Sequence, residues 1–338
     1  MTNQVAYVTL QGDDKLLHFS MDVETGVLEQ KSEISISGGP APLAVSPDQQ
    51  KLYVGLRASH EIASFEIDQA TGALTHLKTI ALDDNPCCIA VDKTGRHLLA
   101  TYYGGGKVTV NVIDSDGTVS NHQTQAVETA THAHYIELDD RNQVAFVPHT
   151  EPANVIFQFK FDENTGQLNP NTPAQLQADP GRGPRHYVYH PTQRWVYTSD
   201  ENGSSVTAYE FDHTSGTLTA FQTESTLPTD FSDENTCAQI HIHPNGQFLY
   251  VSNRGHDSIA CFTIDGSTGQ LTSTGQQPTE PVPRVFNLDF TGNFLYAAGQ
   301  GSGQLASYRI NQTTGSLHPF KTYELGEQPM WVMFLRLT

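Results

Sequence analysis

Short apolar stretches separated by turns recur along the whole chain. One unit runs from Leu43 to Arg57, where an apolar stretch ends in Ser-Pro-Asp and the chain returns through Leu-Tyr-Val. Proline fixes φ and an aspartate side chain bonds nearby backbone, so this pattern predicts two strands joined by a tight turn. The spacing of apolar residues predicts four strands in this unit, at Leu43–Val45, Lys51–Leu56, Glu61–Ile67 and Leu74–Ile80.

Two markers repeat with this unit. A large apolar residue in the second strand recurs every 46 to 53 residues, at Tyr7, Tyr53, Leu99, Phe146, Tyr197, Tyr250 and Tyr296. A turn ending in glycine recurs between the third and fourth strands, at Gly26, Gly72, Gly117, Gly166, Gly216, Gly269 and Gly315. Such a period with four short strands is typical of a β-propeller. We predict an all-β, seven-bladed propeller with four antiparallel strands per blade, forming a single domain over residues 1–338.

The two ends of the chain complement each other. The first apolar stretch, Val5–Leu10, matches a second strand with no first strand before it. The last stretch, 328–334, matches a first strand with nothing after it, and Pro329 aligns with Pro42. We expect the C-terminal strand to complete the N-terminal blade, which closes the ring and removes open sheet edges.

Charge and composition narrow the function classes. The net charge of −19 disfavours binding to nucleic acid or anionic membranes. The N-terminus has no apolar leader, and no apolar run is long enough to span a membrane. The four cysteines, of which Cys87 and Cys88 are adjacent, lack metal-binding spacing and favour a reducing compartment. We therefore expect a cytoplasmic monomer without a cofactor or metal.

The repeat also selects positions beside the channel. The start of the first strand and the end of the second strand meet at one mouth of a propeller. Twelve residues before each marker stand Ala41, Cys87, His134, Arg185, Ala238 and Arg284, and Gln328 is assigned to the blade that closes the ring. Four residues after each marker stand Gln11, Arg57, Tyr103, Thr150, Glu201, Arg254 and Gln300.

Four of the ten arginines fall at these positions. Arginine binds carboxylate or phosphate in a planar, bidentate manner, so the cluster predicts a site for an anionic ligand. Glu201 beside arginines should stay ionised and is a candidate general base. His134 is a candidate proton carrier near neutral pH. The alternative interpretation is a set of buried ion pairs that only join the blades.

Other motifs are weaker. His132 and His134 lack a third metal ligand at matching spacing. The glycine-rich stretch 103–107 leads into a strand rather than a helix, so it lacks a helix N-terminus to bind phosphate. The His-Pro pairs at His190 and His243 occupy the turn position of Ser46-Pro47 and should be structural. The segment Leu227–Thr236 is either a lid over the mouth or a simple insertion.

Several motifs in fixed order resemble the seven-bladed lactonase propellers, in particular the bacterial 6-phosphogluconolactonases of this type. The resemblance covers nearly the whole chain. The matching stretches are Gly183-Pro184-Arg185-His186, Asp230-Phe231-Ser232-Asp233, Ile240-His241-Ile242, Gln277-Pro278-Thr279-Glu280, Pro283-Arg284, Ala297-Ala298-Gly299-Gln300 and Gln328-Pro329-Met330-Trp331-Val332. One departure is Asp230, which stands where the bacterial lactonases have asparagine, and it bears on substrate identity.

The resemblance implies hydrolysis of 6-phosphoglucono-1,5-lactone in the pentose phosphate pathway. A fungal muconate-cycloisomerase branch uses one His, two Arg and one Glu, which correspond to His134, Arg185, Glu201 and Arg254. We expect these four to be catalytic, with either Glu201 or His134 as the base, and no metal. Substrate contacts are expected from Arg57, Tyr103, Arg284, Gln300 and Gln328. The alternatives are a cycloisomerase, a lactonase for another acidic lactone, or a non-catalytic interaction platform.

Overall fold

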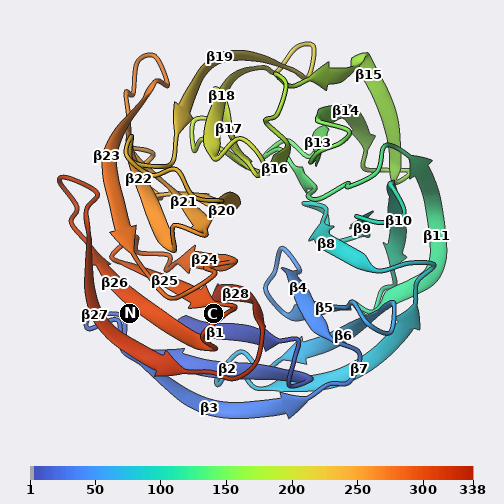
Figure 1. Ribbon diagram of the computed structural model, residues 1–338. Coiled ribbons are helices and arrows are strands. Elements are labelled where there is room, and N and C mark those ends of the chain that lie inside the picture. The colour runs from blue at the N-terminus through green and yellow to red at the C-terminus, as the bar shows by residue number, and fades with distance from the viewer. Residues whose placement is uncertain (1–3, 338) are drawn as a thin grey trace.

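Seven four-stranded antiparallel sheets form a ring around a central channel (Figure 1). The computed structural model describes residues 4–337. Each sheet is one blade, and its first strand lies innermost. The predicted seven-bladed propeller and its four strands per blade are confirmed. Over these described residues, no helix is long and apolar enough to cross a membrane.

Within each of the first four blades, the strands follow one another from the channel outward. Blade 1 contains β28 (Pro329–Arg336), β1 (Gln4–Leu10), β2 (Lys15–Met21) and β3 (Leu28–Ser35). Blade 2 contains β4 (Pro40–Val45), β5 (Lys51–Leu56), β6 (Glu61–Ile67) and β7 (Leu74–Ala81). Blade 3 contains β8 (Pro86–Val91), β9 (His97–Tyr102), β10 (Lys107–Ile113) and β11 (Val119–Glu128). Blade 4 contains β12 (Glu137–Leu138), β13 (Val144–His149), β14 (Val155–Asp162) and β15 (Gln167–Gln177).

The remaining three blades follow the same order. Blade 5 contains β16 (Pro184–Tyr189), β17 (Trp195–Asp200), β18 (Ser205–Asp212) and β19 (Thr217–Ser225). Blade 6 contains β20 (Thr236–Ile242), β21 (Phe248–Arg254), β22 (Ser258–Ile264) and β23 (Leu271–Pro278). Blade 7 contains β24 (Val285–Leu288), β25 (Phe294–Gly299), β26 (Gln304–Ile310) and β27 (Leu317–Glu324).

The C-terminal strand closes the ring as expected. Strand β28 pairs antiparallel with β1, and Met333 lies opposite Tyr7. The two chain ends therefore share blade 1 (Figure 1). Closure gives the inner strand of this blade a partner, which an open ring would leave exposed.

Seven apolar cores hold the ring together, each between two neighbouring blades. The two markers of the repeat are joined directly across these interfaces. The Tyr197 hydroxyl donates to the Gly269 carbonyl of the next blade at 2.8 Å, and Tyr250 donates to Gly315 at 2.8 Å. Tyr7, Tyr53 and Tyr296 bond the glycine turns of their next blades in the same way. The two sequence markers are thus the two halves of one contact.

Histidines in the turns add a second contact between blades. His190 bonds the Gly246 carbonyl of blade 6 at 2.9 Å, and His243 bonds the Gly292 carbonyl of blade 7 at 2.8 Å. The expected structural role of these two His-Pro turns is therefore confirmed.

Candidate active site

A β-bulge at the start of the inner strand directs the key arginine toward the channel. In blade 5, Pro184 pairs with Asp200 and His186 pairs with Ser199, so Arg185 is an extra residue in β16. A bulge of this kind re-aims the side chain of the extra residue. The neighbouring residues Arg185 and His186 both line the same cavity, which regular strand alternation would not allow.

The same register shift recurs in other blades. It falls at Ala41, Cys87 and Ala238, which the repeat had selected, and at Met330 in blade 1. The prediction that Gln328 occupies this position in blade 1 was therefore wrong by two residues, because the position belongs to Met330. Gln328 has a φ of 53° and lies two residues before the bulge at Met330. Gly39 and Gly183 also have positive φ and lie two residues before the bulges of their own blades. Gln328 is solvent-exposed, whereas Met330 lines the cavity.

A proline gives the signal that identifies Met330. Proline directly precedes the bulge or equivalent position in five blades, at Pro40, Pro86, Pro184, Pro283 and Pro329. Aligning Pro329 with Pro42 instead of Pro40 caused the misassignment.

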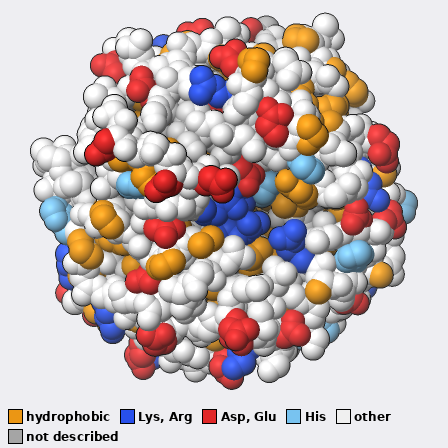
Figure 2. All heavy atoms as spheres, viewed as in Figure 1, with side chains coloured by type: hydrophobic (Ala, Val, Ile, Leu, Met, Phe, Trp, Pro, Cys, Tyr) orange, Lys and Arg blue, Asp and Glu red, His pale blue; other side chains and the backbone are white. Residues whose placement is uncertain are grey.

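The residues from six of these positions surround one small cavity. It has a volume of about 10 Å³ and is lined by residues that include Arg57, Cys87, His134, Arg185 and Arg284. This volume is near the lower limit for a single water molecule. Above it, basic side chains gather at the centre of one face of the molecule, with acidic side chains beside them (Figure 2).

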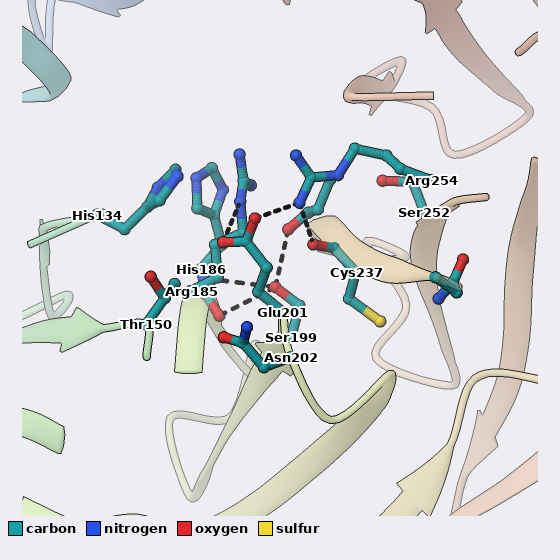
Figure 3. A network of polar contacts seen from close by, with 12 residues as sticks. His134, Thr150, Arg185, His186, Ser199, Glu201, Asn202, Cys237, Ser252 and Arg254 are labelled. Atoms are coloured by element: carbon teal, nitrogen blue, oxygen red, sulfur yellow. Dashed lines mark hydrogen bonds and ion pairs between the residues drawn. The ribbon is translucent and has the colours of Figure 1, made fainter. Parts of the chain in front are cut away.

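Glu201 lies between two of the arginines. Its Oε1 accepts a hydrogen bond from Arg254 Nη2, and its Oε2 lies 3.5 Å from Arg185 Nε (Figure 3). Arg254 Nη2 also donates to the Cys237 carbonyl at 2.9 Å. Because this carboxylate neutralises only one positive charge, the pair of arginines keeps a net positive charge.

The other two arginines have no acidic partner in the described part of the chain. Arg57 Nε donates to Asn85 Oδ1 at 2.8 Å. Within residues 4–337, Arg284 makes no hydrogen bond or ion pair to another side chain. Both side chains are half-buried. The predicted arginines therefore fall into two sets, because Arg185 and Arg254 contact Glu201 whereas Arg57 and Arg284 have no carboxylate partner in the described chain.

Several buried polar atoms of this arginine cluster also lack hydrogen-bond partners within the described chain. Arg185 is 2% exposed, and its Nε and Nη1 atoms have no hydrogen-bond acceptor in the described part of the chain. Glu201 Oε2 and Arg254 Nε likewise lack a hydrogen-bond partner there. Arg185 Nε and Glu201 Oε2 still face each other as an ion pair, whereas Arg185 Nη1 and Arg254 Nε have no partner in the described chain. Leaving buried donors unpaired destabilises the fold, so their presence at one mouth favours a ligand-binding role over a purely structural one.

The environment fixes the protonation states of the acidic and basic groups. Burial alone would raise the pKa of Glu201, but Arg185 and Arg254 outweigh it and the net pKa is lowered. Burial lowers the pKa of Arg185 to about 9, and Glu201 opposes that decrease. Both groups are therefore charged at neutral pH, as the sequence predicted for Glu201.

His134 differs from the prediction in this respect. Burial, reinforced by Arg185, lowers its pKa well below 6.5. The ring therefore stays neutral at pH 7, and the role of proton carrier near neutral pH does not fit this environment. Its ring nitrogens lie 3.7 and 3.8 Å from Cys87 Sγ, and its backbone N–H donates to the Pro148 carbonyl.

Two further predicted substrate contacts lie around the cavity rather than in it. Tyr103 stacks on His132 at 4.1 Å and meets the His134 ring edge-on at 5.6 Å. Gln300 Nε2 lies 3.3 Å from Met330 Sδ, so it reaches the cavity only through that side chain. The substrate-binding roles of Tyr103, Gln300 and Gln328 stay predictions.

Three residues of this site had no role predicted from the sequence. His186, next to Arg185, lines the cavity and is packed between the rings of Tyr135 and His134. Cys87 was identified by position but given no role, and Asn85 positions Arg57. Only the bulge, which cannot be read from residue spacing, brings His186 to the same cavity as Arg185.

The whole propeller matches one protein family. The family model described as "Lactonase, 7-bladed beta-propeller" matches residues 4–334.

The chain belongs to the seven-bladed lactonase propeller family.

Two curated relatives of this lactonase propeller carry the same name. A 6-phosphogluconolactonase of Pectobacterium atrosepticum is 37% identical over 249 residues, which is 73% of each chain. A 6-phosphogluconolactonase of Yersinia enterocolitica is 33% identical over 333 residues, which is 98% of each chain. The lactonase-type enzyme class expected from the sequence motifs agrees with these relatives.

Solved structures support the fold of the lactonase propeller. The periplasmic gluconolactonase PpgL of Pseudomonas aeruginosa superposes with a TM-score of 0.92 at 22% identity, over the full length of both chains. A Lactobacillus plantarum protein superposes with a TM-score of 0.89 at 26% identity, covering 99% of this chain and 100% of its own.

The segment joining β19 and β20 ends one residue before the predicted boundary, because Thr236 pairs with Arg254 in the sheet. Phe231 in this segment meets the His256 ring edge-on at 4.7 Å.

Within residues 4–337, no cluster of three His, Cys, Asp or Glu side chains is arranged to bind a metal ion. The lid role, the monomeric state and the cytoplasmic location stay predictions.

Proposed function

We propose that this protein hydrolyses 6-phosphoglucono-1,5-lactone at the arginine-lined mouth of its channel, without a metal ion. The observation that carries the proposal is the gathering of four arginines at one mouth, where two of them pair with Glu201 and two have no carboxylate partner in the described chain. The name that the curated relatives share supports this substrate. A phosphorylated lactone presents an anionic phosphate and a carbonyl on which negative charge develops, and the two arginine pairs match these two features.

Arg57 and Arg284 bind the phosphate in this proposal. Neither is neutralised by a carboxylate in the described chain, and both are half-buried beside the cavity. Arginine binds a phosphate through two parallel hydrogen bonds. Holding the phosphate there places the lactone ring over the small cavity at the base of the mouth.

Arg185 and Arg254 stabilise the reacting carbonyl. Attack by water on the lactone carbon converts the carbonyl oxygen into an oxyanion, and preorganised positive charge lowers the energy of that state. Arg185 lines the cavity together with His134 and Cys87, and its Nη1 donor has no hydrogen-bond acceptor in the described part of the chain. This donor needs no rearrangement before the reaction.

Glu201 serves as the general base. Its Oε2 lacks a hydrogen-bond partner, and its lowered pKa keeps it ionised. It takes one proton from the attacking water as the new C–O bond forms. When the ring C–O bond breaks, the carboxyl returns that proton to the departing ring oxygen. The product carboxylic acid then loses a proton to solvent. Neutral His134 orients the water.

The test is a coupled assay with freshly generated 6-phosphogluconolactone and 6-phosphogluconate dehydrogenase, with chelator present. We expect hydrolysis above the spontaneous rate that resists chelation and is lost in Arg185→Ala. No acceleration by the wild-type protein would exclude this substrate. Sensitivity to chelation would contradict the metal-free mechanism. Full activity of Glu201→Gln would exclude Glu201 as the base and leave the substrate assignment intact.

A further inference from the structure

The opposite mouth of the channel holds a second and larger cavity. It has a volume of about 430 Å³ and is lined by the ends of the inner strands of six blades. Leu43, Ile89 and Met333 contribute to its apolar walls, and Tyr135 and Trp331 contribute aromatic rings. We call it the distal cavity. Its volume and its mainly apolar lining with a few polar groups are those of small-molecule sites.

One carboxylate in the distal cavity has no positive partner. Glu137 is half-buried, and its Oε2 accepts a hydrogen bond from the Tyr135 hydroxyl at 3.1 Å. No ion pair joins Glu137 to a basic side chain within residues 4–337. Lys93 lies at the solvent-exposed rim, where its charge is screened by water.

The other polar groups of the distal cavity are satisfied or neutral. Asn287 donates to the Val332 carbonyl at 3.0 Å and accepts from the Leu288 N–H at 2.8 Å. Gln239 Oε1 accepts from the Phe286 N–H at 3.1 Å. Burial lowers the pKa of His241 to about 4, so this ring is neutral. Glu137 is therefore the charge that selects a ligand.

We propose that the distal cavity binds a small organic ammonium compound with an apolar or aromatic body. The ammonium group pairs with Glu137, and the apolar body occupies the space between the aromatic and aliphatic walls. Aromatic faces such as those of Tyr135 and Trp331 attract cations in addition to excluding water. Charge complementarity favours a cation over an anion, and the apolar walls favour an organic cation over a hydrated metal ion.

The distal cavity and the arginine-lined mouth share a partition. Trp331 lines both cavities. Tyr135 stacks on His186 at 4.5 Å, and the Trp331 ring lies 6.3 Å from His186. A ligand in the distal cavity therefore contacts the side chains that support His186 from below. The fluorescence of Trp331 should report its binding, because the other tryptophan, Trp195, is fully buried between blades.

The test titrates the whole protein with 2-phenylethylamine, followed by tryptophan fluorescence and calorimetry in the absence of lactone. We expect saturable binding with a Kd on the order of 1 mM or tighter. The neutral analogue 2-phenylethanol should bind at least about tenfold more weakly, because it cannot form the charged hydrogen bond. Equal binding of the two probes, or no saturation with the amine, would overturn the proposal.

Variants locate the site. Glu137→Gln keeps an acceptor for Tyr135 and should weaken amine binding about tenfold or more. Glu128→Gln, at an exposed position on β11, should leave amine binding unchanged. If Glu137→Gln fails to fold, Met333→Lys, which places a positive charge in the cavity, should abolish amine binding. Unchanged affinity in the folded variant would overturn the proposal. Because no lactone is present, this result is independent of the proposed hydrolysis.

Discussion

The two mouths of the channel differ in charge although largely the same inner strands build both. The starts of these strands carry Arg185, Arg284 and His134, whereas their ends present mainly apolar side chains to the distal cavity. At the starts, bulges interrupt the regular pairing and turn an extra side chain inward. Toward the ends, pairing is regular, as for Val188 with Tyr197. A local break in strand register thus makes one mouth suitable for charge chemistry and leaves the other suitable for an apolar ligand.

The largest effect should come from Arg185→Met at the arginine-lined mouth. Loss of its donors should lower kcat for 6-phosphogluconolactone by about 10²- to 10³-fold, the usual cost of losing one oxyanion donor. Arg141→Met is the matched control, because Arg141 is solvent-exposed and outside the mouth, and its kcat should stay within about twofold. Thermal unfolding should establish that both variants fold. A folded Arg185→Met with more than half of the wild-type kcat would contradict the role assigned to Arg185.

The next effect separates the two arginine pairs. Arg284→Met should raise KM for the phosphorylated lactone by about 10- to 100-fold, because one charged hydrogen-bonding group to phosphate is lost. The KM for unphosphorylated gluconolactone should change much less. Steady-state kinetics with both lactones measures the difference. An equal increase for both substrates would show that Arg284 does not bind the phosphate.

A smaller effect concerns the stability of the arginine-lined mouth. Asp200, beside Glu201, is buried, and burial raises its pKa from 3.8 to about 6. The folded state therefore binds the Asp200 proton more tightly than the unfolded state does. The stabilisation from this tighter binding is fully present below pH 3.8 and is lost as the pH rises through about 6. Relative to wild type, Asp200→Asn should gain about 1–3 kcal/mol in the free energy of unfolding between pH 4 and pH 7. Urea unfolding at both pH values measures this, and a parallel pH dependence of the two proteins would contradict it.

The smallest effect is expected from pH itself. Glu201 stays ionised because its pKa is lowered, and His134 stays neutral because its pKa is also lowered. With unphosphorylated gluconolactone, kcat/KM corrected for spontaneous hydrolysis should change less than about twofold from pH 7.5 to pH 5.5. The unphosphorylated substrate removes the titration of the phosphate group, whose second pKa is about 6. An acid limb with an apparent pKa near 6.5 that persists in Asp200→Asn would show that a histidine titrates in the site.

The sequence pattern was sufficient to predict the architecture because every blade of a propeller makes the same kind of contact with its neighbours. Each blade must bury its faces against its neighbours, so Tyr250 and Gly315 recur at fixed spacing and bond each other across the interface. Ring closure by β28 followed from an unpaired half-blade at each end. The arginines were also found from the sequence, because a cationic side chain at a channel-facing repeat position has no packing function.

Only the tertiary structure decided how those side chains act. Residue spacing identified Arg185 but not the bulge that brings His186 beside it, because a bulge adds a residue without changing the hydrophobic pattern. Spacing also assigned Gln328 to the mouth, where the pairing of β28 places Met330. The neutral state of His134 depends on burial and on nearby arginines from other blades. The sequence determined the ring and which charged residues face its channel. The distances between blades decided how those residues pair and which of them carry a charge, because electrostatic energies depend on separation and burial rather than on order along the chain.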